Sequence, residues 1–387
     1  SQTNMSEYIH TAYKKAARIQ TVVCGFLFAL FSFVYLYVFQ RDVLEALHFS
    51  LAHGKTHFAP LASAIIITFI LILLRWGVNC LLGLKGNVRA FSYLPSCLIL
   101  GVLTDIGKNI YTEDYHTPWG WLLPIILLIY SLLVFWLRRL LRNRLNKESN
   151  PVSLMNYNLL ILILLCLMTV LIGNTNRKFH HELEAERYLR EHRYTEVLKV
   201  GEKSLEATRT LTVLRSIAMS RAGLLGEKLF AYPQYYRSDG LFFANDSMQT
   251  LRYTNDSIYY LLGVRPYTGE DRMKFLRNIC YRGTGKYTAL DYYLSALLLE
   301  KQIDAFGKAL TDFYETEDTL SRYYKEALLM YRESHPDCPF LITDSILIKR
   351  YDEYHERKTD FASSVMERNG MRREFGDTYW WYFDYQE

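Results

Sequence analysis

The sequence predicts an all-α protein in two parts, a bundle of five transmembrane helices followed by a soluble helical domain. Residues 1–176 contain five apolar stretches and carry a net charge of +7, whereas residues 177–387 carry −2 and contain no long apolar run. Neither part has the alternating apolar and polar residues that indicate a strand. The mean hydropathy of −0.04 is therefore the average of two unlike parts and does not describe either.

Five spans are predicted because backbone groups in hydrocarbon must bond within their own segment, which a helix of about 20 residues achieves. The predicted spans are residues 21–40, 59–84, 91–107, 119–137 and 157–174. The first span is not a cleavable signal peptide, because its apolar run is too long and no small-residue cleavage site follows. Arg75 is the one full charge inside an apolar stretch, and we expect it to reach the membrane surface or to make a structural hydrogen bond.

Lys and Arg are unevenly distributed among the segments that flank the spans. Ten lie before the first span and in the second and fourth connections, against three in the first and third connections. Since cytoplasmic loops carry such an excess, the amino terminus is predicted to be cytoplasmic and residues 177–387 to lie on the other side of the membrane. The basic residues belong to the membrane part, so lipids are the expected partners there and nucleic acid is not.

The soluble part has apolar residues at helical spacing, which predicts a series of helix pairs. The expected helices cover residues 183–190, 194–205, 210–225, 268–281, 289–300, 303–314, 319–333, 344–357 and 359–368. Residues 184–207, 290–315 and 325–339 resemble tetratricopeptide repeats, with small residues where two helices approach. This resemblance implies an α-solenoid with a concave binding surface.

Five spans followed by a helical domain that ends in FGDTYWWYF (375–383) resemble an uncharacterised Bacteroidota family of polytopic inner-membrane proteins. The resemblance implies a bacterial inner membrane and a periplasmic domain over residues 177–387, and it supplies no catalytic residues. A terminal run of aromatic residues cannot stay solvated without exposing a large apolar patch. We expect it to seal the end of the domain, rather than to enter the membrane interface or dock a partner.

Few residues suggest chemistry. His53 and His57 would share one face of a helix, as metal ligands do, although Gly54 weakens that helix. Cys280 and Cys338 could form a disulfide in an oxidising compartment. No nucleotide-binding, metalloprotease or hydrolase motif occurs, so we predict no catalytic residue and no cofactor.

Paired aromatic residues are the stronger indication of binding, because one ring of each pair can pack inside while its neighbour reaches a groove. The partner-binding candidates are Tyr259, Tyr260, Tyr292, Tyr293, Tyr323, Tyr324, Trp380 and Trp381. Four Asp–Ser/Thr–apolar triplets also match the pattern that Bacteroidota use for periplasmic O-glycosylation. Their acceptor hydroxyls belong to Ser247, Ser257, Thr319 and Ser345.

These observations predict a non-enzymatic, membrane-anchored scaffold whose helical repeats bind another envelope protein, with a peptide or a glycan as further candidate ligands. The alternative is a polytopic enzyme or transport subunit that acts on a lipid-linked or glycan substrate at the periplasmic membrane face. A cluster of charged side chains at one membrane depth would favour that alternative. The residues that could form it are Asp105, Lys108, Glu113, Asp114, His116 and the segment 48–57.

Overall fold

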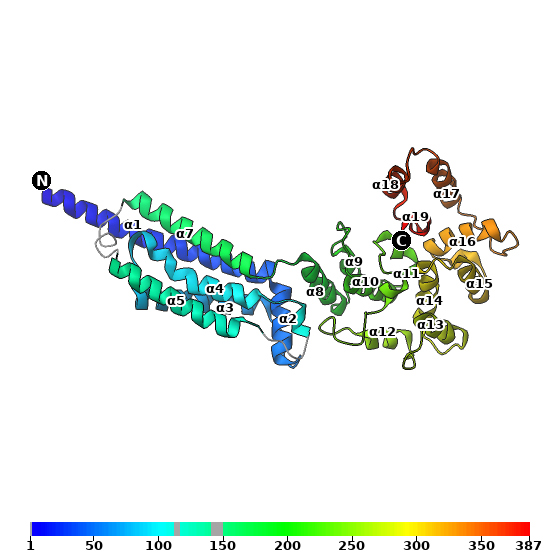
Figure 1. Cartoon of the computed structure of the whole chain (residues 1–387), viewed down its shortest axis with the longest axis horizontal. Helices are drawn as coiled ribbons and strands as arrows, with labels where there is room; N and C mark the ends of the chain where they lie inside the picture. The colour runs from blue at the N-terminus through cyan, green and yellow to red at the C-terminus, as the bar shows by residue number, and fades with distance from the viewer. Residues whose placement is uncertain (1, 112–116, 141–149) are drawn as a thin grey trace. The chain divides into compact units, whose positions relative to one another are not determined.

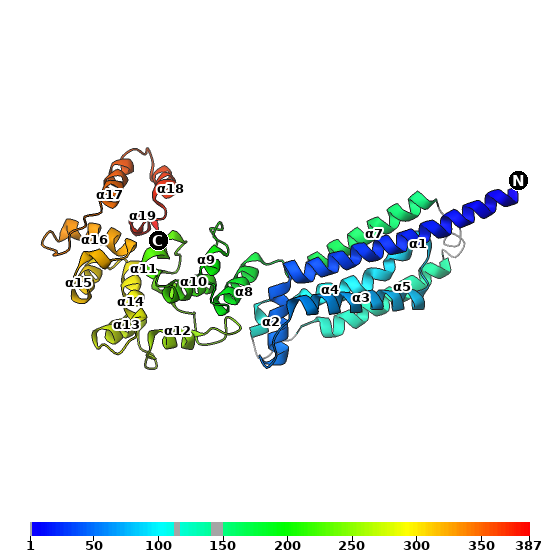
Figure 2. The same ribbon diagram turned by 180° about the vertical axis from the view of Figure 1, so that it is seen from behind.

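A computed structural model describes residues 2–111, 117–140 and 150–387, and Figures 1 and 2 draw it from opposite sides. Every regular element in these residues is a helix and none is a strand, which confirms the all-α fold class. The chain divides into two compact units, Ser1–His180 and His181–Glu387. We call them the membrane unit and the C-terminal unit, and the division lies four residues after the predicted one.

The membrane unit contains five helical segments that are long and apolar enough to cross a membrane, as predicted. These segments are His10–Phe39, Pro60–Leu82, Gly86–Thr104, Trp119–Leu140 and Pro151–Ile172. Its longer helices are α1 (Gln2–Val34), α2 (Arg41–Ala52), α3 (Pro60–Leu82), α4 (Leu94–Thr104), α5 (Trp119–Leu140) and α7 (Pro151–Ile172). Its short helical turns are η1 (Tyr35–Phe39), η2 (Gly86–Tyr93) and η3 (Lys108–Tyr111). Helices α1 and α7 run side by side in both views.

The third apolar segment is not one helix. A 3-10 stretch, η2, covers its first part, and α4 begins at Leu94 with Pro95 in its first turn. Proline has no N–H to donate and favours the start of a helix, so the change at this point follows from the sequence.

Polar side chains inside the membrane unit bond mainly to the backbone of neighbouring helices. Asn158 on α7 accepts from the amide of Ala90 at 2.7 Å and donates to the carbonyl of Gly86 at 3.0 Å. The Ser96 hydroxyl donates to the Leu71 carbonyl at 2.8 Å. These bonds join α7 to η2 and α4 to α3. Within a membrane, no water would be available to satisfy the same groups.

A second set of polar hydrogen bonds lies at the end of the helix bundle from which the chain continues into the C-terminal unit. The hydroxyls of Tyr35 and Thr104 are 3.0 Å apart, and the amide of Gln40 donates to the Asn174 carbonyl at 3.1 Å. A Cβ atom at Gly173 would lie 2.1 Å from the Tyr35 hydroxyl, so only glycine fits here.

The C-terminal unit is built from short helices around one central helix, α14. Its helices are α8 (Arg177–Arg190), α9 (Tyr194–Lys199), α10 (Arg209–Arg221), α11 (Leu225–Lys228), α12 (Asn255–Leu262), α13 (Arg272–Tyr281), α14 (Thr288–Leu299), α15 (Ile303–Phe313), α16 (Arg322–Ser334), α17 (Ser345–Lys358), α18 (Ser364–Phe375) and α19 (Tyr379–Tyr385). Its short 3-10 turns are η4 (Leu229–Ala231), η5 (Arg237–Leu241) and η6 (Glu317–Thr319). Because α10, α11, α12, α13 and α15 all contact α14, that helix is buried on nearly every side.

The terminal aromatic run packs on the preceding helices, as expected. Four consecutive side chains from Tyr379 to Tyr382 are buried. The hydroxyls of Tyr379 and Tyr382 donate to the carbonyls of Leu298 and Leu299, at 3.1 and 2.7 Å. These two carbonyls lie in the last turn of α14, where a helix leaves its own acceptors without partners. The Tyr382 hydroxyl therefore gives the Leu299 carbonyl a partner, and the Tyr379 hydroxyl adds a second donor to the Leu298 carbonyl, which also accepts from the Lys301 amide.

Candidate functional site

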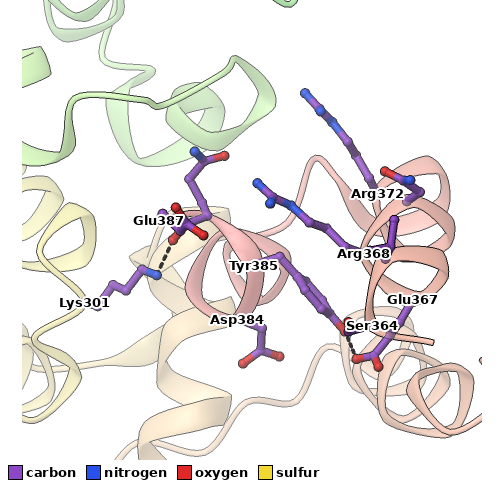
Figure 3. A pocket seen from close by; sticks show the side chains of 11 residues that line it. Lys301, Ser364, Glu367, Arg368, Arg372, Asp384, Tyr385 and Glu387 are labelled. Carbon is purple, nitrogen blue, oxygen red and sulfur yellow. Dashed lines mark hydrogen bonds between the residues drawn. The ribbon is translucent and has the colours of Figure 1, made fainter.

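A pocket of about 590 Å³ opens between α18 and the end of α19 in the C-terminal unit. Figure 3 shows its lining side chains. The lining residues are Lys301, Ser364, Val365, Glu367, Arg368, Asn369, Arg372, Asp384, Tyr385, Gln386 and Glu387. The volume lies within the range of small-ligand and side-chain binding sites.

Capping residues fix where the two helices that form the pocket walls, α18 and α19, begin. The Ser363 hydroxyl accepts from the amide of Met366 and begins α18, and the Thr378 hydroxyl accepts from the amide of Trp381 and begins α19. The Trp381 indole then donates to the Arg368 carbonyl at 3.4 Å, which joins the two walls. Trp381 is buried and links α18 to α19 without lining the pocket itself.

Arg368 and Arg372 are one helical turn apart, and Figure 3 shows both guanidinium groups reaching from α18 in the same direction. The Arg372 guanidinium lies 5.4 Å from the Trp381 ring centroid. In the described part of the chain, neither guanidinium forms an ion pair with a carboxylate. Two arginines on one helix face repel each other, so their free donors favour an anion.

Three other charged groups that line the pocket, Glu367, Asp384 and Lys301, already have partners, and Glu387 lines it as well. Glu367 accepts from the Tyr385 hydroxyl. Burial is the main cause that raises the pKa of Tyr385, and the bond to Glu367 is the second. Asp384 accepts from Lys358 at 2.7 Å. Lys301 donates to the Gln386 carbonyl, and burial lowers the pKa of its ammonium group. The two arginines are therefore the cationic groups of the pocket that are most available to a ligand.

A family model described as a family of unknown function, DUF6057, matches residues 8–268 and 267–386. The chain belongs to the DUF6057 family. No curated protein and no solved structure matches the chain. The matched segments cover all but the first seven residues of the membrane unit and the last residue of the C-terminal unit, and they include Arg368 and Arg372.

Most of the aromatic partner-binding candidates have rings that lie inside the fold. Tyr292, Tyr293, Tyr323, Tyr324, Trp380 and Trp381 are buried, with exposed fractions between 0% and 6%. Both tyrosines of a pair can be buried because α14 and α16 are covered on more than one face. Tyr259 is partly buried between Phe242 and Phe275. Tyr260 alone is fully accessible, with 77% exposure and Lys286 against its ring.

The helical geometry expected for the two histidines is not found in the structure. Helix α2 ends at Ala52, and His53 adopts a left-handed conformation with φ of 48°. His53 and His57 therefore do not share one helix face. Among the described residues, no group of three His, Cys, Asp or Glu side chains could hold a metal ion. His116 lies outside the described residues.

Cys280 and Cys338 are both free thiols, so the predicted disulfide is not formed. Cys280 lies on α13 and Cys338 follows α16. Burial raises the pKa of the Cys280 thiol to about 12, which leaves it unreactive at neutral pH. The sequence could not place the two thiols relative to each other, because they come from separate helices.

The four candidate acceptor hydroxyls differ in accessibility. Ser247, Thr319 and Ser345 are exposed, on a loop, on η6 and at the first position of α17. Ser257 is partly buried, and its hydroxyl accepts from the Thr254 amide as part of a capping box.

Sequence analysis missed two buried carboxylates. Glu186 on α8 accepts from the amides of Leu251 and Arg252, and burial raises its pKa to about 7. Glu326 on α16 accepts from Arg322 at 2.8 Å and from the Tyr379 amide, and burial likewise raises its pKa to about 7. Neither residue lines the pocket, and both bind backbone, so they hold the fold together.

The pocket itself was also missed. One signal in the sequence could have indicated it: Arg368 and Arg372 place like charges four residues apart on a helix, an arrangement that costs stability unless something binds there.

Proposed function

We propose that this protein is a non-enzymatic scaffold in a bacterial inner membrane, whose C-terminal unit binds an acidic segment of another envelope protein. The observation that carries this proposal is the pair of unpaired arginines at the pocket between α18 and α19. Arginine is enriched at interfaces and holds carboxylates through two parallel hydrogen bonds.

Apolar side chains beside the arginines favour a protein segment over a small inorganic anion. Val365 lines the pocket and is 67% exposed, and its neighbour Met366 is 62% exposed. An acidic segment with an apolar residue next to its carboxylate would cover both kinds of surface. The helix pairs α8–α9 and α14–α15 resemble tetratricopeptide repeats, which present such surfaces in a solenoid.

The proposed orientation places the amino terminus in the cytoplasm and the C-terminal unit in the periplasm, on the charge asymmetry of the connections. We propose a Bacteroidota host on the resemblance alone. In that compartment the exposed hydroxyls of Ser247, Thr319 and Ser345 would be glycosylated. Intact-mass measurement of the native protein should then show added sugar, which Ser→Ala and Thr→Ala substitutions at these positions remove.

The enzymatic or transport alternative needs a charged cluster beside the membrane, and we do not adopt it. Asp105 accepts from the Trp119 indole at 2.6 Å, and His48 pairs with the Thr56 hydroxyl at 3.1 Å. Glu113 and Asp114 lie outside the described residues.

Site-specific photo-crosslinking in the native host tests the scaffold proposal. A photoreactive amino acid at Asn369, which lines the pocket between the two arginines, should give one discrete crosslinked partner. The double charge reversal Arg368→Glu, Arg372→Glu should abolish that product. The control is Arg373→Glu, an exposed arginine on the same helix that does not line the pocket. A product that survives the double reversal would contradict the proposal.

A further inference from the structure

Arg75 lies inside the membrane unit and, among the described residues, has no carboxylate partner. It is 8% exposed, whereas its neighbour Trp76 faces outward with 64% exposure. Its Nε atom donates to the Ser92 hydroxyl at 3.1 Å, and its guanidinium lies 4.8 Å from the Tyr93 ring centroid. Its Nη2 atom is buried and has no hydrogen-bond partner. A buried donor of a charged group that forms no hydrogen bond costs more free energy than most single interactions contribute to stability.

Arg89 is a second cation in the same place. It lies on η2, three residues before Ser92, and its Nε atom is also buried without a partner. The two guanidinium groups repel each other, and the groups that interact with Arg89 are Arg75, Tyr93, Tyr13 and Cys24, none of which is a carboxylate. The chain contains no Asp or Glu from residue 46 to residue 104, so neither α3 nor η2 can neutralise the pair.

Buried acceptors without partners accompany these donors. Gln20 on α1 is 1% exposed and donates to the Cys24 thiol at 3.4 Å, while its Oε1 atom has no partner. Asn79 lies one turn beyond Arg75 on α3, and its Oδ1 atom is likewise buried and unpartnered. Together these four atoms indicate a polar ligand that brings both anionic oxygens and hydroxyl or water donors.

We propose that Arg75 and Arg89 form a binding site for a phosphate group between α1, α3 and η2. A phosphate oxygen matches the forked donors of a guanidinium and neutralises two arginines at once. A phospholipid headgroup and a free phosphate share this chemistry. A lipid headgroup at the end of α3 would be near this site, because Arg75 is seven residues, or about 10 Å, from Leu82. Basic pockets between transmembrane helices bind lipid headgroups in this manner.

The experiment uses the full chain, purified in a neutral detergent and stripped of bound lipid. The midpoint of thermal unfolding of the membrane unit is followed while dioleoyl-phosphatidylglycerol, dioleoylglycerol or inorganic phosphate is added. We expect phosphatidylglycerol to raise the midpoint in a saturable manner and dioleoylglycerol, which lacks the phosphate, to leave it unchanged. A rise with inorganic phosphate would identify the free anion as a sufficient ligand, and no rise would identify the lipid as the source.

Arg89→Gln is the deciding variant, because Arg75→Gln would also remove the bond to Ser92 and the contact with Tyr93. The loss of one charged hydrogen-bond donor should weaken phosphatidylglycerol binding about tenfold. Lys85→Gln, at an exposed cation just before η2, is the matched control and should bind as the parent does. The proposal is overturned if dioleoylglycerol stabilises as well as phosphatidylglycerol, or if Arg89→Gln binds phosphatidylglycerol with unchanged affinity.

Discussion

Helices α3 and α14 are both strongly apolar, yet α3 leaves many of its large side chains exposed and α14 buries most of its residues. On α3 the large side chains Ile65, Phe69 and Ile70 are more than half exposed, whereas on α14 ten of the twelve residues are buried. Their lengths separate them: α3 has 23 residues and can cross a bilayer, and α14 has 12 and cannot. A strongly apolar helix is thus one whose side chains are kept from water. Its length indicates whether lipid or other parts of the protein cover those side chains.

The two units also treat buried polar groups differently. In the membrane unit, Asn158 and Ser96 bond to backbone carbonyls and amides of neighbouring helices. The C-terminal unit instead buries the carboxylates of Glu186 and Glu326 against backbone amides. An ionisable group is tolerated where water can penetrate during opening, and it is far more costly within hydrocarbon. Glu45 on α2 is also buried in the membrane unit. Within the apolar segments of that unit, Arg75 and Arg89 keep buried donors that have no partner among the described residues, which is why we assign them a ligand.

The largest expected effect concerns the side of the membrane on which the C-terminal unit and the end of α5 lie. Alkaline phosphatase, which is active only in the periplasm, should be active when joined after Glu387 and inactive when joined after Leu140 at the end of α5. Five spans and the charge asymmetry of the connections require this result. Activity of the Leu140 fusion alone would reverse the orientation, and the proposals for the pocket and the acceptor hydroxyls would then lose their compartment.

A second prediction compares one large aromatic residue from each unit. Trp380 is completely buried and donates to the Glu326 carbonyl at 2.9 Å, so Trp380→Ala should cost about 3–5 kcal/mol of unfolding free energy. Phe69 is 59% exposed on α3, and Phe69→Ala should change stability by no more than about 0.5 kcal/mol in detergent. Chemical denaturation of the full chain, monitored by proteolysis of each unit, measures both. Equal losses would mean that Phe69 packs against protein.

The pattern of apolar residues predicts the helices well where one face is buried or where the run is long. The expected helices 289–300 and 303–314 correspond to α14 (Thr288–Leu299) and α15 (Ile303–Phe313). The expected helix 359–368 is displaced, because α18 begins at the Ser363 cap and continues through Gly370. A Cβ atom at Gly370 would lie 2.3 Å from the Phe361 ring, so that glycine allows a close contact and does not end the helix.

The candidate sites were harder to predict, for a physical reason. Periodicity shows which residues share a helix face, but it cannot show that a second helix covers the opposite face, as it does for Tyr292 and Tyr293 on α14. The pocket joins Lys301 to residues of α18 and α19 that lie more than 60 positions later. Contacts of that separation depend on how helices pack, which spacing along one helix does not encode.

A third prediction concerns pH and distinguishes the C-terminal unit from the membrane unit. Folding raises the pKa of Glu186 from 4.5 to about 7 because the side chain is buried. The folded state therefore binds more protons than the unfolded state between these values, and its stability falls as pH rises from 5 to 8. Glu186 accounts for at most about 3 kcal/mol of that fall.

Glu186→Gln should reduce the slope of unfolding free energy against pH, measured by denaturation of the full chain at several pH values. A residual slope should remain because Glu326 titrates in the same range. Glu184→Gln, a substitution of a partly exposed acid on the same helix, is the matched control and should retain the parent slope. If both variants keep the parent slope, Glu186 is ionised in the folded protein throughout this range.

The smallest expected effect tests whether the membrane unit depends on its backbone-directed hydrogen bonds. Asn158→Leu removes the acceptor of the Ala90 amide and the donor to the Gly86 carbonyl, while keeping the side chain about the same size. Hydrogen bonds between transmembrane helices contribute little individually, because the unfolded chain in a micelle also finds partners, so the expected loss is about 1–2 kcal/mol. Unfolding by increasing mole fraction of dodecyl sulfate measures this loss.

Tyr157→Leu is the control. Tyr157 is the residue before Asn158, its side chain is 55% exposed, and its replacement should cost no stability. The Asn158 variant should also leave the C-terminal unit unaffected, because all its partners lie on η2 and α7. If Asn158→Leu is as stable as the control, α7 and η2 are held together by packing alone, and the contrast between the two units reduces to which surface of each apolar helix is covered.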